Sequence, residues 1–286
     1  MKNILKRLED DLSTYSKTQR LIAEYILKNY DKAAFMTAAK LSAKTGASES
    51  TVVRFAAELG YDGYPAMQRE LQNVIKNKLT ATQRIEITGD KIRADVVDSV
   101  LRADAENILA TIDTIDRDEF NKVIECILSA HNIYIIGIRA SSALAQFLGF
   151  YLNHIVPNVH VISTISGSEV FEQILRVSGE DAFIGVSFPR YSKRTLKAMK
   201  YAHSKGAKVI AITDTESSPL CQYADYKMTA RSGMVSFADS LVAPLSLINA
   251  IIAALSIKKE NEVVNTLSSL EAIWDEYNVY EKSYNE

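Results

Sequence analysis

The chain has 286 residues, of which 47% are hydrophobic and 24% are charged, and its net charge is −2. This composition excludes a disordered chain and a polyelectrolyte, and the length is sufficient for about two domains. The charge is unevenly distributed, because residues 1–77 carry 12 Lys and Arg against 9 Asp and Glu, a net +3, whereas the remaining 21 against 26 give −5. A basic N-terminal part on an acidic body is compatible with nucleic-acid binding.

The first 77 residues predict helices only. The capping and helix-ending residues, in chain order, are Ser16 with Gln19 in the form of a capping box, Thr37, Gly46, Ser48 and Gly60. They predict helices that begin near residues 17 and 38, a helix over 49–59, and a fourth helix from Pro65 to about Asn77.

The helix over 49–59 has a buried and an outer face. Apolar side chains recur at i, i+3, i+4 and i+7, namely Val52, Phe55, Ala56 and Leu59. Ser50, Thr51 and Arg54 remain on the outer face, and Lys44 lies near the end of the preceding helix. In helix-turn-helix proteins the N-terminal residues of the second helix enter the major groove of DNA. An ordinary helical hairpin with a solvated polar face has the same spacing, so the spacing alone leaves both interpretations open.

The stretch "LSAKTGASESTVVRFAAELGYDGYPAMQRELQ", residues 41–72, resembles the helix-turn-helix of RpiR-type bacterial transcription regulators. The run Ser-x-Ser-Thr-Val-x-Arg-Phe followed by Leu-Gly-Tyr-x-Gly-Tyr is its most diagnostic part. The resemblance covers residues 1–77 and implies binding to double-stranded DNA, with a palindromic operator and a homodimer or tetramer. Tyr61 and Tyr64 are expected near the DNA backbone or in the packing of the domain. The predicted DNA-binding residues are Lys44, Ser48, Ser50, Thr51, Arg54, Tyr61 and Tyr64.

Residues 78–113 predict a linker and a connecting helix, and the pattern changes after Phe120 to alternating strands and helices. Five short β-branched or aromatic runs predict strands: "NIYIIGI", "VHVIST", "DAFIGVSF", "AKVIAIT" and "DYKMTAR". Helices are expected near 141–153, 168–177, 192–205, 217–223, 239–258 and 263–277. Buried strands that alternate with helices are typical of a doubly wound α/β domain with a parallel sheet. The predicted parts are an all-α domain over 1–77, a connection over 78–113, an α/β domain over 114–258 and a helical tail over 259–286.

Hydroxyl-bearing turns follow two of the predicted strands. The first strand ends in "GIRASS" and the third in "VSFPRYSKRT". In open parallel sheets, ligands bind beyond the carboxyl ends of the strands, and helix N-termini favour anions. Serine is also a common helix cap in any protein, so a purely structural role for Ser141 and Ser192 stays open.

Together these features resemble the sugar isomerase (SIS) domain, a flavodoxin-like phosphosugar-binding module, over about residues 120–257. The family's first loop reads Gly-x-Gly-x-Ser and its second Ser-x-Ser-Gly-x-Thr, and here Arg139 and Arg190 replace glycines while Pro189 replaces a serine. Guanidinium groups bind phosphate or carboxylate in bidentate fashion. The resemblance therefore implies a small anionic effector, a phosphorylated sugar or amino sugar. The predicted ligand-binding residues are Gly137, Arg139, Ser141, Ser142, Glu169, Ser187, Arg190, Ser192 and Thr195.

The sequence favours a sensor over an enzyme. Aldose–ketose isomerisation needs a general base, and Glu169 could serve, although acids are common in the first turn of any helix. No metal-ligand spacing or nucleotide-binding loop is visible, so we expect neither a metal nor a cofactor. Two alternatives stay open: a phosphosugar isomerase with an accessory helical domain, and a DNA-binding protein whose α/β domain ignores ligands.

The sequence predicts a cytoplasmic protein with reduced thiols. The two cysteines, Cys126 and Cys221, lie far apart, and the N-terminus "MKNILKRLEDD" has no apolar core. One apolar run of 17 residues, Leu241–Ile257, is interrupted by Pro, Ser and Asn. We expect it to be a buried helix in the core or in a subunit interface, and not a membrane span.

Overall fold

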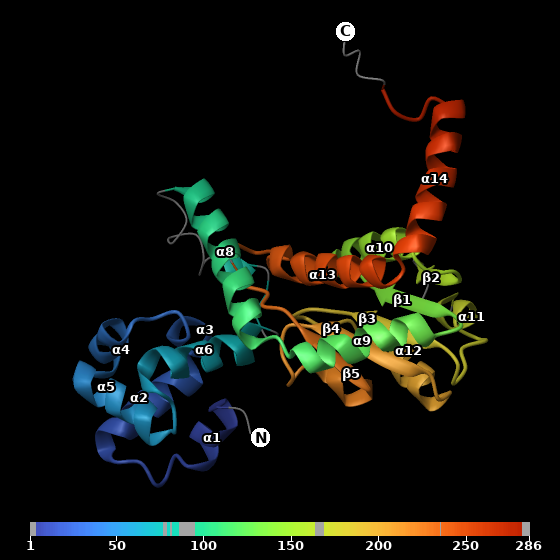
Figure 1. The fold of residues 1–286 in the computed structure, drawn as a ribbon. Helices are drawn as coiled ribbons and strands as arrows, with labels where there is room; N and C mark the ends of the chain where they lie inside the picture. The colour runs from blue at the N-terminus through green and yellow to red at the C-terminus, as the bar shows by residue number, and fades with distance from the viewer. Residues whose placement is uncertain are drawn as a thin grey trace. The chain divides into compact units, whose positions relative to one another are not determined.

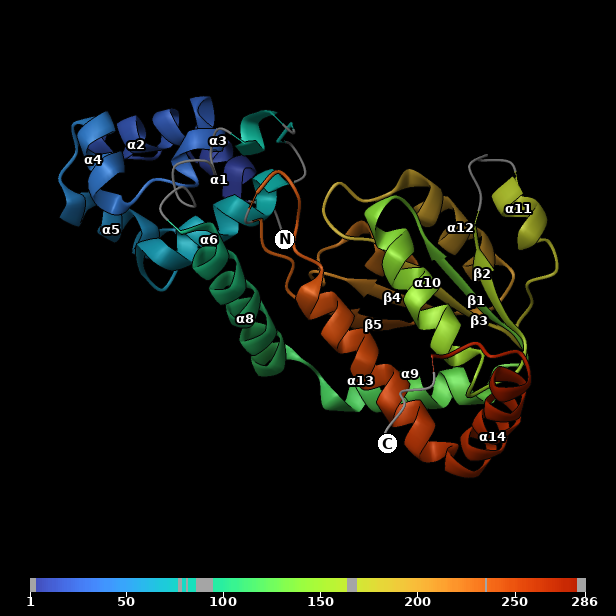
Figure 2. The same cartoon turned by 90° about the horizontal axis from the view of Figure 1, so that it is seen from above.

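The computed structural model of the chain describes residues 4–76, 79, 80, 82–85, 95–163, 169–234 and 236–281. The chain forms two compact units, which are drawn in Figures 1 and 2. Unit 1 consists of residues 1–100 together with 234–239, and unit 2 consists of residues 101–233 and 240–286. The segment 234–239 therefore belongs to unit 1 although both of its flanks belong to unit 2.

Unit 1 is helical, and its helix limits follow local capping. Its helices are α1 (Ile4–Asp10), α2 (Lys17–Lys28), α3 (Tyr30–Ala33), α4 (Ala38–Thr45), α5 (Glu49–Glu58) and α6 (Gly63–Lys76). The capping box of Ser16 with Gln19 is confirmed, and the Ser48 side chain caps α5 by accepting from the Thr51 N–H. Gly46 ends α4 in the left-handed conformation at φ 71°, which a residue without Cβ adopts at little cost.

The core of unit 1 confirms the buried face predicted for α5. Val52, Phe55, Ala56 and Leu59 are buried, and the Phe55 ring meets the Tyr15 ring edge-on at 5.2 Å between centroids. The short helices α1 and α3 were not predicted, because neither carries the capping pattern that marked the others. Helix α1 nevertheless contributes buried apolar side chains to this core.

Unit 2 contains a five-stranded parallel sheet in the order β2-β1-β3-β4-β5, which confirms the predicted doubly wound α/β fold. Its strands are β1 (Ile133–Gly137), β2 (Val159–Ile162), β3 (Ala182–Val186), β4 (Lys208–Thr213) and β5 (Tyr226–Thr229). In the register, Ile136 of β1 lies opposite Ile162 of β2 and Gly185 of β3. The carboxyl ends of β1, β2 and β3 therefore meet at one edge of the sheet.

Helices cover both faces of this sheet (Figures 1 and 2). They are α9 (Arg117–Ser129), α10 (Ala140–Leu152), α11 (Glu169–Gln173), α12 (Lys193–Ser204) and α13 (Val242–Lys258), with a 3-10 helix, η1 (Pro219–Tyr223). Alternate residues of β1 enter different cores, because Ile135 packs in the cluster with α9, α10 and α13, whereas Ile136 packs in the cluster with α11 and α12. This alternation follows from the period of two along a strand.

Several predicted elements differ from the observed ones. Helix α9 was not predicted, although the Asp116 side chain caps it by accepting from two backbone N–H groups. The helix expected at 217–223 is the 3-10 helix η1, and the described part of the helix expected at 168–177 is only Glu169–Gln173. The helix expected from 239 begins at Val242, because the preceding residues form a loop tied to other elements.

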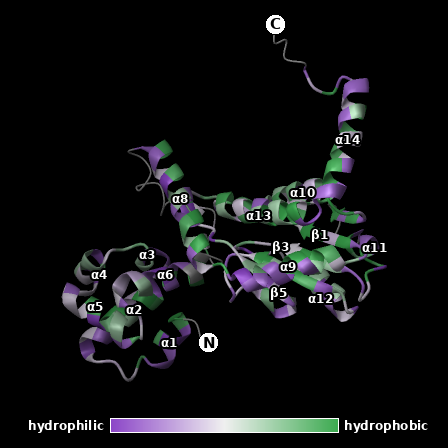
Figure 3. Ribbon diagram, viewed as in Figure 1, coloured by the Kyte–Doolittle hydropathy of each residue, from purple (hydrophilic) through white to green (hydrophobic). Residues whose placement is uncertain are grey.

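The apolar run 241–257 forms α13, whose buried face includes Leu247, Ile248 and Ile251 in the core of unit 2. Helix α14 (Glu260–Glu276) follows at an angle of 99° to it. Figure 3 shows green, hydrophobic residues along α13 and purple, hydrophilic residues along much of α14. Within the described residues no single helix is long and apolar enough to span a membrane, and only the bent pair α13 and α14 passes that test when taken together.

Candidate functional sites

The first candidate site is the outer face of α5 in unit 1. Lys44, Ser48, Ser50 and Arg54 are exposed and Thr51 is half-buried. This pattern follows from the capping of α5 at Ser48 and from its buried stripe, which turns every third or fourth residue toward the core. The residues therefore present hydroxyl and guanidinium groups on one side of the helix start.

Three hydroxyl groups at the start of α5 are held together. The Ser48 Oγ lies 2.9 Å from the Ser50 Oγ and 2.7 Å from the Thr51 Oγ1, and it also accepts from the Thr51 N–H at 3.2 Å. Small hydroxyls let a helix approach a surface closely, and the N–H groups of a helix start favour a phosphate. The arrangement can bind an anionic backbone while Arg54 reaches further along the same face.

Tyr64 does not belong to this face, and its burial agrees with the second of its two predicted places, the packing of the domain. Only 4% of its surface is exposed, and its hydroxyl donates to the Met36 carbonyl at 2.7 Å. Burial raises the pKa of Tyr64 to about 12. Tyr61 is half-buried, with the Arg7 guanidinium 5.9 Å from its ring centroid. Tyr64 therefore fixes α6 against the chain segment before α4.

Val53 was missed by the sequence reasoning. It lies between Thr51 and Arg54 on α5, and 41% of its surface is exposed. An apolar side chain beside a recognition surface can contact a thymine methyl group in the major groove. The signal was present, because Val53 falls outside the i, i+3, i+4 stripe of the core.

The second candidate site is a cavity of about 560 Å³ in unit 2, at the carboxyl ends of β1 and β2. Its walls combine backbone, polar and charged groups from four stretches of chain. The lining residues are Gly137, Ile138, Arg139, Ser142, Ala145, Gln146, Val161, Ile162, Ser163 and Glu169. A cavity of this size, in which several polar groups converge, is compatible with a small-molecule site.

The loop between β1 and α10 forms one wall of this cavity. A Cβ on Gly137 would lie 2.2 Å from the Ser141 carbonyl oxygen, so the close approach of α10 to the strand requires glycine. Arg139 is exposed, and its carbonyl accepts from the Ser142 hydroxyl at 2.6 Å. Ser142 lines the cavity, whereas Ser141 is buried at 7% exposure and does not belong to the described lining. The contact of Ser141 with a ligand therefore stays a prediction.

The loop between β3 and α12 has its own internal bonds. The buried Ser187 hydroxyl accepts from the Ser192 N–H at 3.0 Å, and the Ser192 side chain caps α12 by accepting from the Thr195 N–H at 3.3 Å. Thr195 has no exposed surface, and its contact with a ligand stays a prediction. Arg190 between these residues is exposed. Within the described residues, none of these four lines the 560 Å³ cavity.

Further polar residues, which the sequence reasoning missed, lie at the same edge of the sheet. Gln146 and Ser163 line the cavity. The Tyr191 hydroxyl donates to Asp214 Oδ1 at 2.7 Å, directly after β4. The signal for Gln146 was its position one and a half turns into α10, on the side of Ser142. No local pattern marks Asp214, because its partner lies 23 residues earlier in the chain.

Glu169 begins α11 and lines the cavity, as its predicted role requires. No histidine belongs to the described lining, and His160 instead stacks on Tyr134 at 5.0 Å between ring centroids. Across the residues that the structure describes, no three His, Cys, Asp or Glu side chains come together to hold a metal ion. The cavity therefore offers one carboxylate, one guanidinium and several hydrogen-bonding groups.

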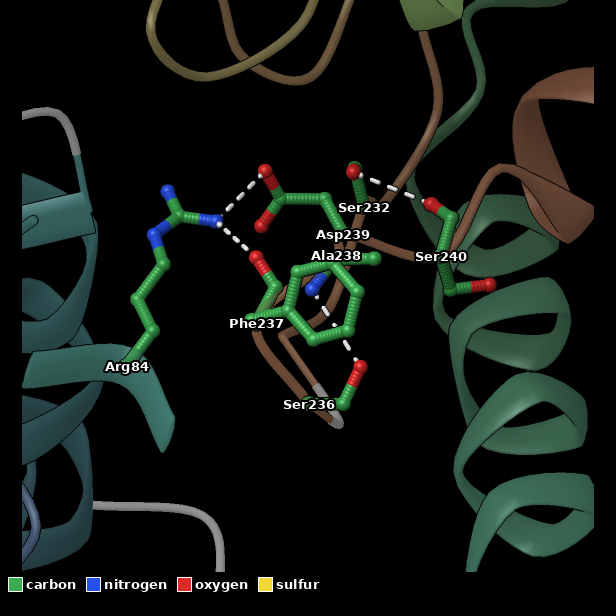
Figure 4. A network of polar contacts seen from close by, with 7 residues as sticks. All are labelled: Arg84, Ser232, Ser236, Phe237, Ala238, Asp239 and Ser240. Carbon is green, nitrogen blue, oxygen red and sulfur yellow. Dashed lines mark hydrogen bonds and ion pairs between the residues drawn. The ribbon is translucent and has the colours of Figure 1, made fainter. Parts of the chain in front are cut away.

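The loop between β5 and α13 carries a buried ion pair in unit 1 (Figure 4). The Arg84 Nη1 donates to Asp239 Oδ2 at 2.9 Å and to the Phe237 carbonyl at 3.5 Å, and the two charged side chains are 3% and 14% exposed. Met234 packs against the core of the same unit. The tip of the loop, residues 234–239, is thus held within unit 1.

The two ends of this loop are held within unit 2 by α8 (Val96–Thr114). The Arg231 N–H donates to Thr111 Oγ1 at 2.9 Å, and the Ser240 hydroxyl donates to Asp104 Oδ1 at 2.5 Å. The Ser232 hydroxyl also donates to the Ser240 carbonyl at 3.0 Å, which closes the base of the loop (Figure 4). Both ends of the loop are thus bonded within unit 2.

Two protein families match this chain. The helix-turn-helix domain of the rpiR family matches residues 2–78, and the SIS domain matches residues 126–254. An uncharacterised HTH-type transcriptional regulator of Clostridium perfringens is 24% identical over 82% of this chain and 84% of its own length. The HTH-type transcriptional regulator HexR of Pseudomonas aeruginosa is 25% identical over 78% of this chain and 76% of its own.

Solved structures share the fold. The sugar isomerase domain of an RpiR transcription factor from Sphaerobacter thermophilus superposes with a TM-score of 0.58 and 26% identity, over 60% of this chain and 96% of that one. The NanR protein of Vibrio vulnificus, solved in complex with ManNAc-6P, superposes with a TM-score of 0.60 and 24% identity. That likeness covers 96% of this chain and 99% of NanR.

Proposed function

We propose that this chain, which belongs to the RpiR type of transcriptional regulators with a helix-turn-helix and a SIS domain, binds operator DNA and responds to a phosphorylated sugar or amino sugar. The observation that carries the proposal is the pairing of an exposed polar helix start on α5 with a polar cavity at the carboxyl edge of a flavodoxin-like sheet. Its place of action would be the bacterial cytoplasm, where the operator is.

The outer face of α5 supports the DNA-binding part of the proposal. Ser50, Thr51 and Val53 would face base edges and sugars in the major groove, and Arg54 would contact a guanine edge or a phosphate. Lys44 and the N–H groups at the Ser48 cap would hold the phosphate backbone. Sequence-specific DNA binding needs both kinds of contact: phosphate contacts position the protein, and base contacts read the sequence.

The cavity in unit 2 supports the ligand-binding part. Ser142, Gln146 and Ser163 offer hydrogen bonds to sugar hydroxyls, and the N-terminus of α10 together with Arg139 favours an anion. NanR, which shares the fold, is solved with a phosphorylated amino sugar. A phosphorylated sugar is therefore the class of ligand that these groups fit best.

Three hydrogen bonds, joined by neighbouring residues along the chain, connect the loop between β3 and α12 with the base of the loop 231–241. Tyr191 donates to Asp214, the Ala230 N–H donates to the Thr213 carbonyl at 2.9 Å, and Arg231 donates to Thr111. We propose that the ligand changes operator affinity through this loop, whose tip belongs to unit 1. Such a coupling requires that the ligand has different affinities for two arrangements of the chain.

A double substitution tests this route. Arg84→Met with Asp239→Leu removes both charges of a buried pair, an exchange that is often neutral for stability. We expect ligand binding and operator binding each to persist, while the effect of ligand on operator affinity falls at least threefold. A double variant that keeps the full ligand effect would contradict the route through the loop.

The protein is proposed to act as a homodimer or tetramer, because a two-fold axis matches a palindromic operator. Helix α8 supports this, since Val97, Leu101 and Ile112 leave apolar surface exposed along it. Selection of bound sequences from random duplex DNA tests the proposal: we expect a motif with two-fold symmetry. Recovery of sequences without any enriched motif would contradict operator recognition.

The competing function is phosphosugar isomerisation, and the position of Glu169 in the cavity is the observation in its favour. A carboxylate beside the substrate carbons is the general base that such a reaction needs. The test is to incubate the protein with aldose and ketose phosphates and follow their interconversion by NMR. Turnover that Glu169→Gln abolishes would establish the enzyme, and we expect no turnover.

A further inference from the structure

Two arginines of unit 2 have a backbone conformation that favours glycine. In the described part of the chain, four non-glycine residues have positive φ: Arg139 at 60°, Asn158 at 59°, Arg190 at 62° and Asn278 at 51°. Asparagine tolerates this region because its short side chain bonds locally, whereas a long side chain is disfavoured there. Arg139, with ψ of −126°, lies in a region that is populated almost only by glycine.

Both strained arginines stand at the same edge of the sheet. Arg139 follows β1 by two residues and Arg190 follows β3 by four, and the ends of these strands are paired, with Gly137 opposite Val186. Both side chains are exposed, and Arg139 lines the 560 Å³ cavity. Backbone strain that persists at two neighbouring loops, the first of which lines the cavity, points to a function of the side chains, because glycine would relieve it.

Two acidic groups also lie at this edge. Glu169 lines the cavity, and Asp214 accepts from Tyr191, the residue next to Arg190. The arginines could therefore serve to balance these carboxylates inside the folded chain. The two roles make opposite predictions for a glycine variant: loss of an internal ion pair destabilises the chain, whereas loss of a strained ligand contact stabilises it.

We propose that Arg139 and Arg190 bind a second anionic group of the ligand, so that the effector is a phosphorylated sugar that also carries a carboxylate or a second phosphate. The proposal rests on the proposed function and narrows its ligand class. Helices α10 and α12 begin at this edge, and a helix N-terminus suffices to hold one phosphate. The two guanidinium groups are therefore not needed for that phosphate, and their planar arrays of donors match the geometry of a second oxyanion.

The test uses the full chain and matched probes. Isothermal titration compares glucose 6-phosphate with 6-phosphogluconate, which differs by a carboxylate, and with fructose 1,6-bisphosphate, which carries a second phosphate. We expect the wild-type chain to bind one of the doubly anionic sugars at least tenfold more tightly than glucose 6-phosphate. Whichever of the two binds more tightly identifies the second group as carboxylate or phosphate.

Glycine variants separate the two roles of the arginines. Arg139→Gly and Arg190→Gly should each raise the Tm of the ligand-free chain by about 2–4 °C by removing strain. Each should also weaken binding of the doubly anionic sugar at least tenfold and that of glucose 6-phosphate less than threefold. Asn158→Gly is the matched control, because it removes a positive-φ side chain outside the cavity lining and should leave both affinities unchanged.

Each failure has a distinct meaning. A lower Tm in both glycine variants would show that the arginines balance internal carboxylates, and it would overturn the proposal. Equal wild-type affinities for glucose 6-phosphate and the doubly anionic sugars would overturn it as well, while leaving phosphosugar sensing in place. Binding of none of the three would contradict the proposed phosphosugar site itself and this inference with it.

Discussion

The two candidate sites of this chain are built in different ways. The candidate DNA-binding surface on α5 comes from consecutive turns of one helix, whose direction is fixed by a cap at Ser48 and a buried stripe that includes Phe55. The cavity in unit 2 comes from the ends of two strands and the starts of two helices, with Arg139 and Glu169 thirty residues apart. A local site depends on one helix, whereas an assembled site depends on the whole sheet.

The difference has a consequence for how substitutions act. A residue on the outer face of α5 can change without disturbing the core, so stability and DNA affinity should separate there. Residues at the sheet edge both shape the fold and line the cavity, as Gly137 shows by its close approach to α10. Stability and ligand affinity should therefore be linked in unit 2.

The largest expected effect comes from Arg84→Met, which leaves the largely buried Asp239 carboxylate, 14% exposed, without its ion-pair partner. Removing one member of a buried pair costs about 3–5 kcal/mol. Because both residues belong to unit 1, we expect hydrogen exchange to accelerate in α2, α4 and α5 more than in the sheet. The double variant with Asp239→Leu is the control and should recover most of the loss; equal acceleration in both units would contradict the placement of the loop tip in unit 1.

Asp181→Asn tests how much a single buried carboxylate contributes to the stability of unit 2. The buried Asp181 carboxylate accepts from Asn132 and from Ser178, and although burial alone would raise its pKa, these hydrogen bonds lower it below the ordinary value. We expect the variant to lose about 1.5–3 kcal/mol near neutral pH, as for hydrogen bonds to a charged group.

The contribution of Asp181 to the free energy of unfolding should depend on pH. A depressed folded pKa stabilises the chain above the ordinary pKa of about 3.9, and this stabilisation disappears as the pH falls through the folded value. Calorimetric unfolding between pH 3 and pH 7 should therefore show a difference between wild type and Asp181→Asn that shrinks toward acid. A difference that stays constant with pH would mean that the Asp181 charge does not contribute.

Arg54→Ala should separate affinity from stability in unit 1. Loss of a guanidinium contact to a base edge weakens specific DNA binding by about 1–3 kcal/mol. The side chain is exposed, so the free energy of unfolding should stay within about 0.5 kcal/mol of wild type. Fluorescence anisotropy with the selected operator measures the first quantity, and unchanged operator affinity would remove Arg54 from the recognition surface.

The smallest expected effect is that of Tyr64→Phe. Unlike Arg54→Ala, this variant should change stability and leave operator affinity unchanged. The variant removes the hydrogen bond to the Met36 carbonyl and should cost about 1 kcal/mol of stability. Because the ring is buried, operator affinity measured at a temperature where both proteins are folded should not change. A selective loss of operator affinity in Tyr64→Phe would restore Tyr64 to the candidate DNA-binding surface.

The parts of the fold that could be predicted are those with local causes. Capping at Ser16, Thr37 and Ser48 gives the helix starts, and the alternation of apolar strands with helices gives the doubly wound sheet. Helix α9 was missed although its start carries a local signal, because Asp116 caps it two residues after the end of α8. The exposed face of α5 followed directly from its buried stripe.

The remaining features depend on contacts that are distant in sequence. Arg84 and Asp239 are 155 residues apart, and no local pattern marks either as a partner. The burial of Thr195 and of Ser141 follows from how α12 and α10 pack on the sheet, although both residues lie in the first turn of a helix that follows a loop of ligand-binding type. The positive φ of Arg139 could be anticipated only from the glycine that the resemblance places there.

The most direct test of ligand-controlled DNA binding is an operator titration with and without ligand. The wild-type chain is titrated into labelled operator by fluorescence anisotropy, alone and with a saturating phosphorylated sugar whose binding calorimetry has established. We expect a change of about 5–150-fold in operator affinity, the usual range for coupled sites. Superimposable titrations with a ligand that demonstrably occupies unit 2 would show that the α/β domain does not regulate DNA binding.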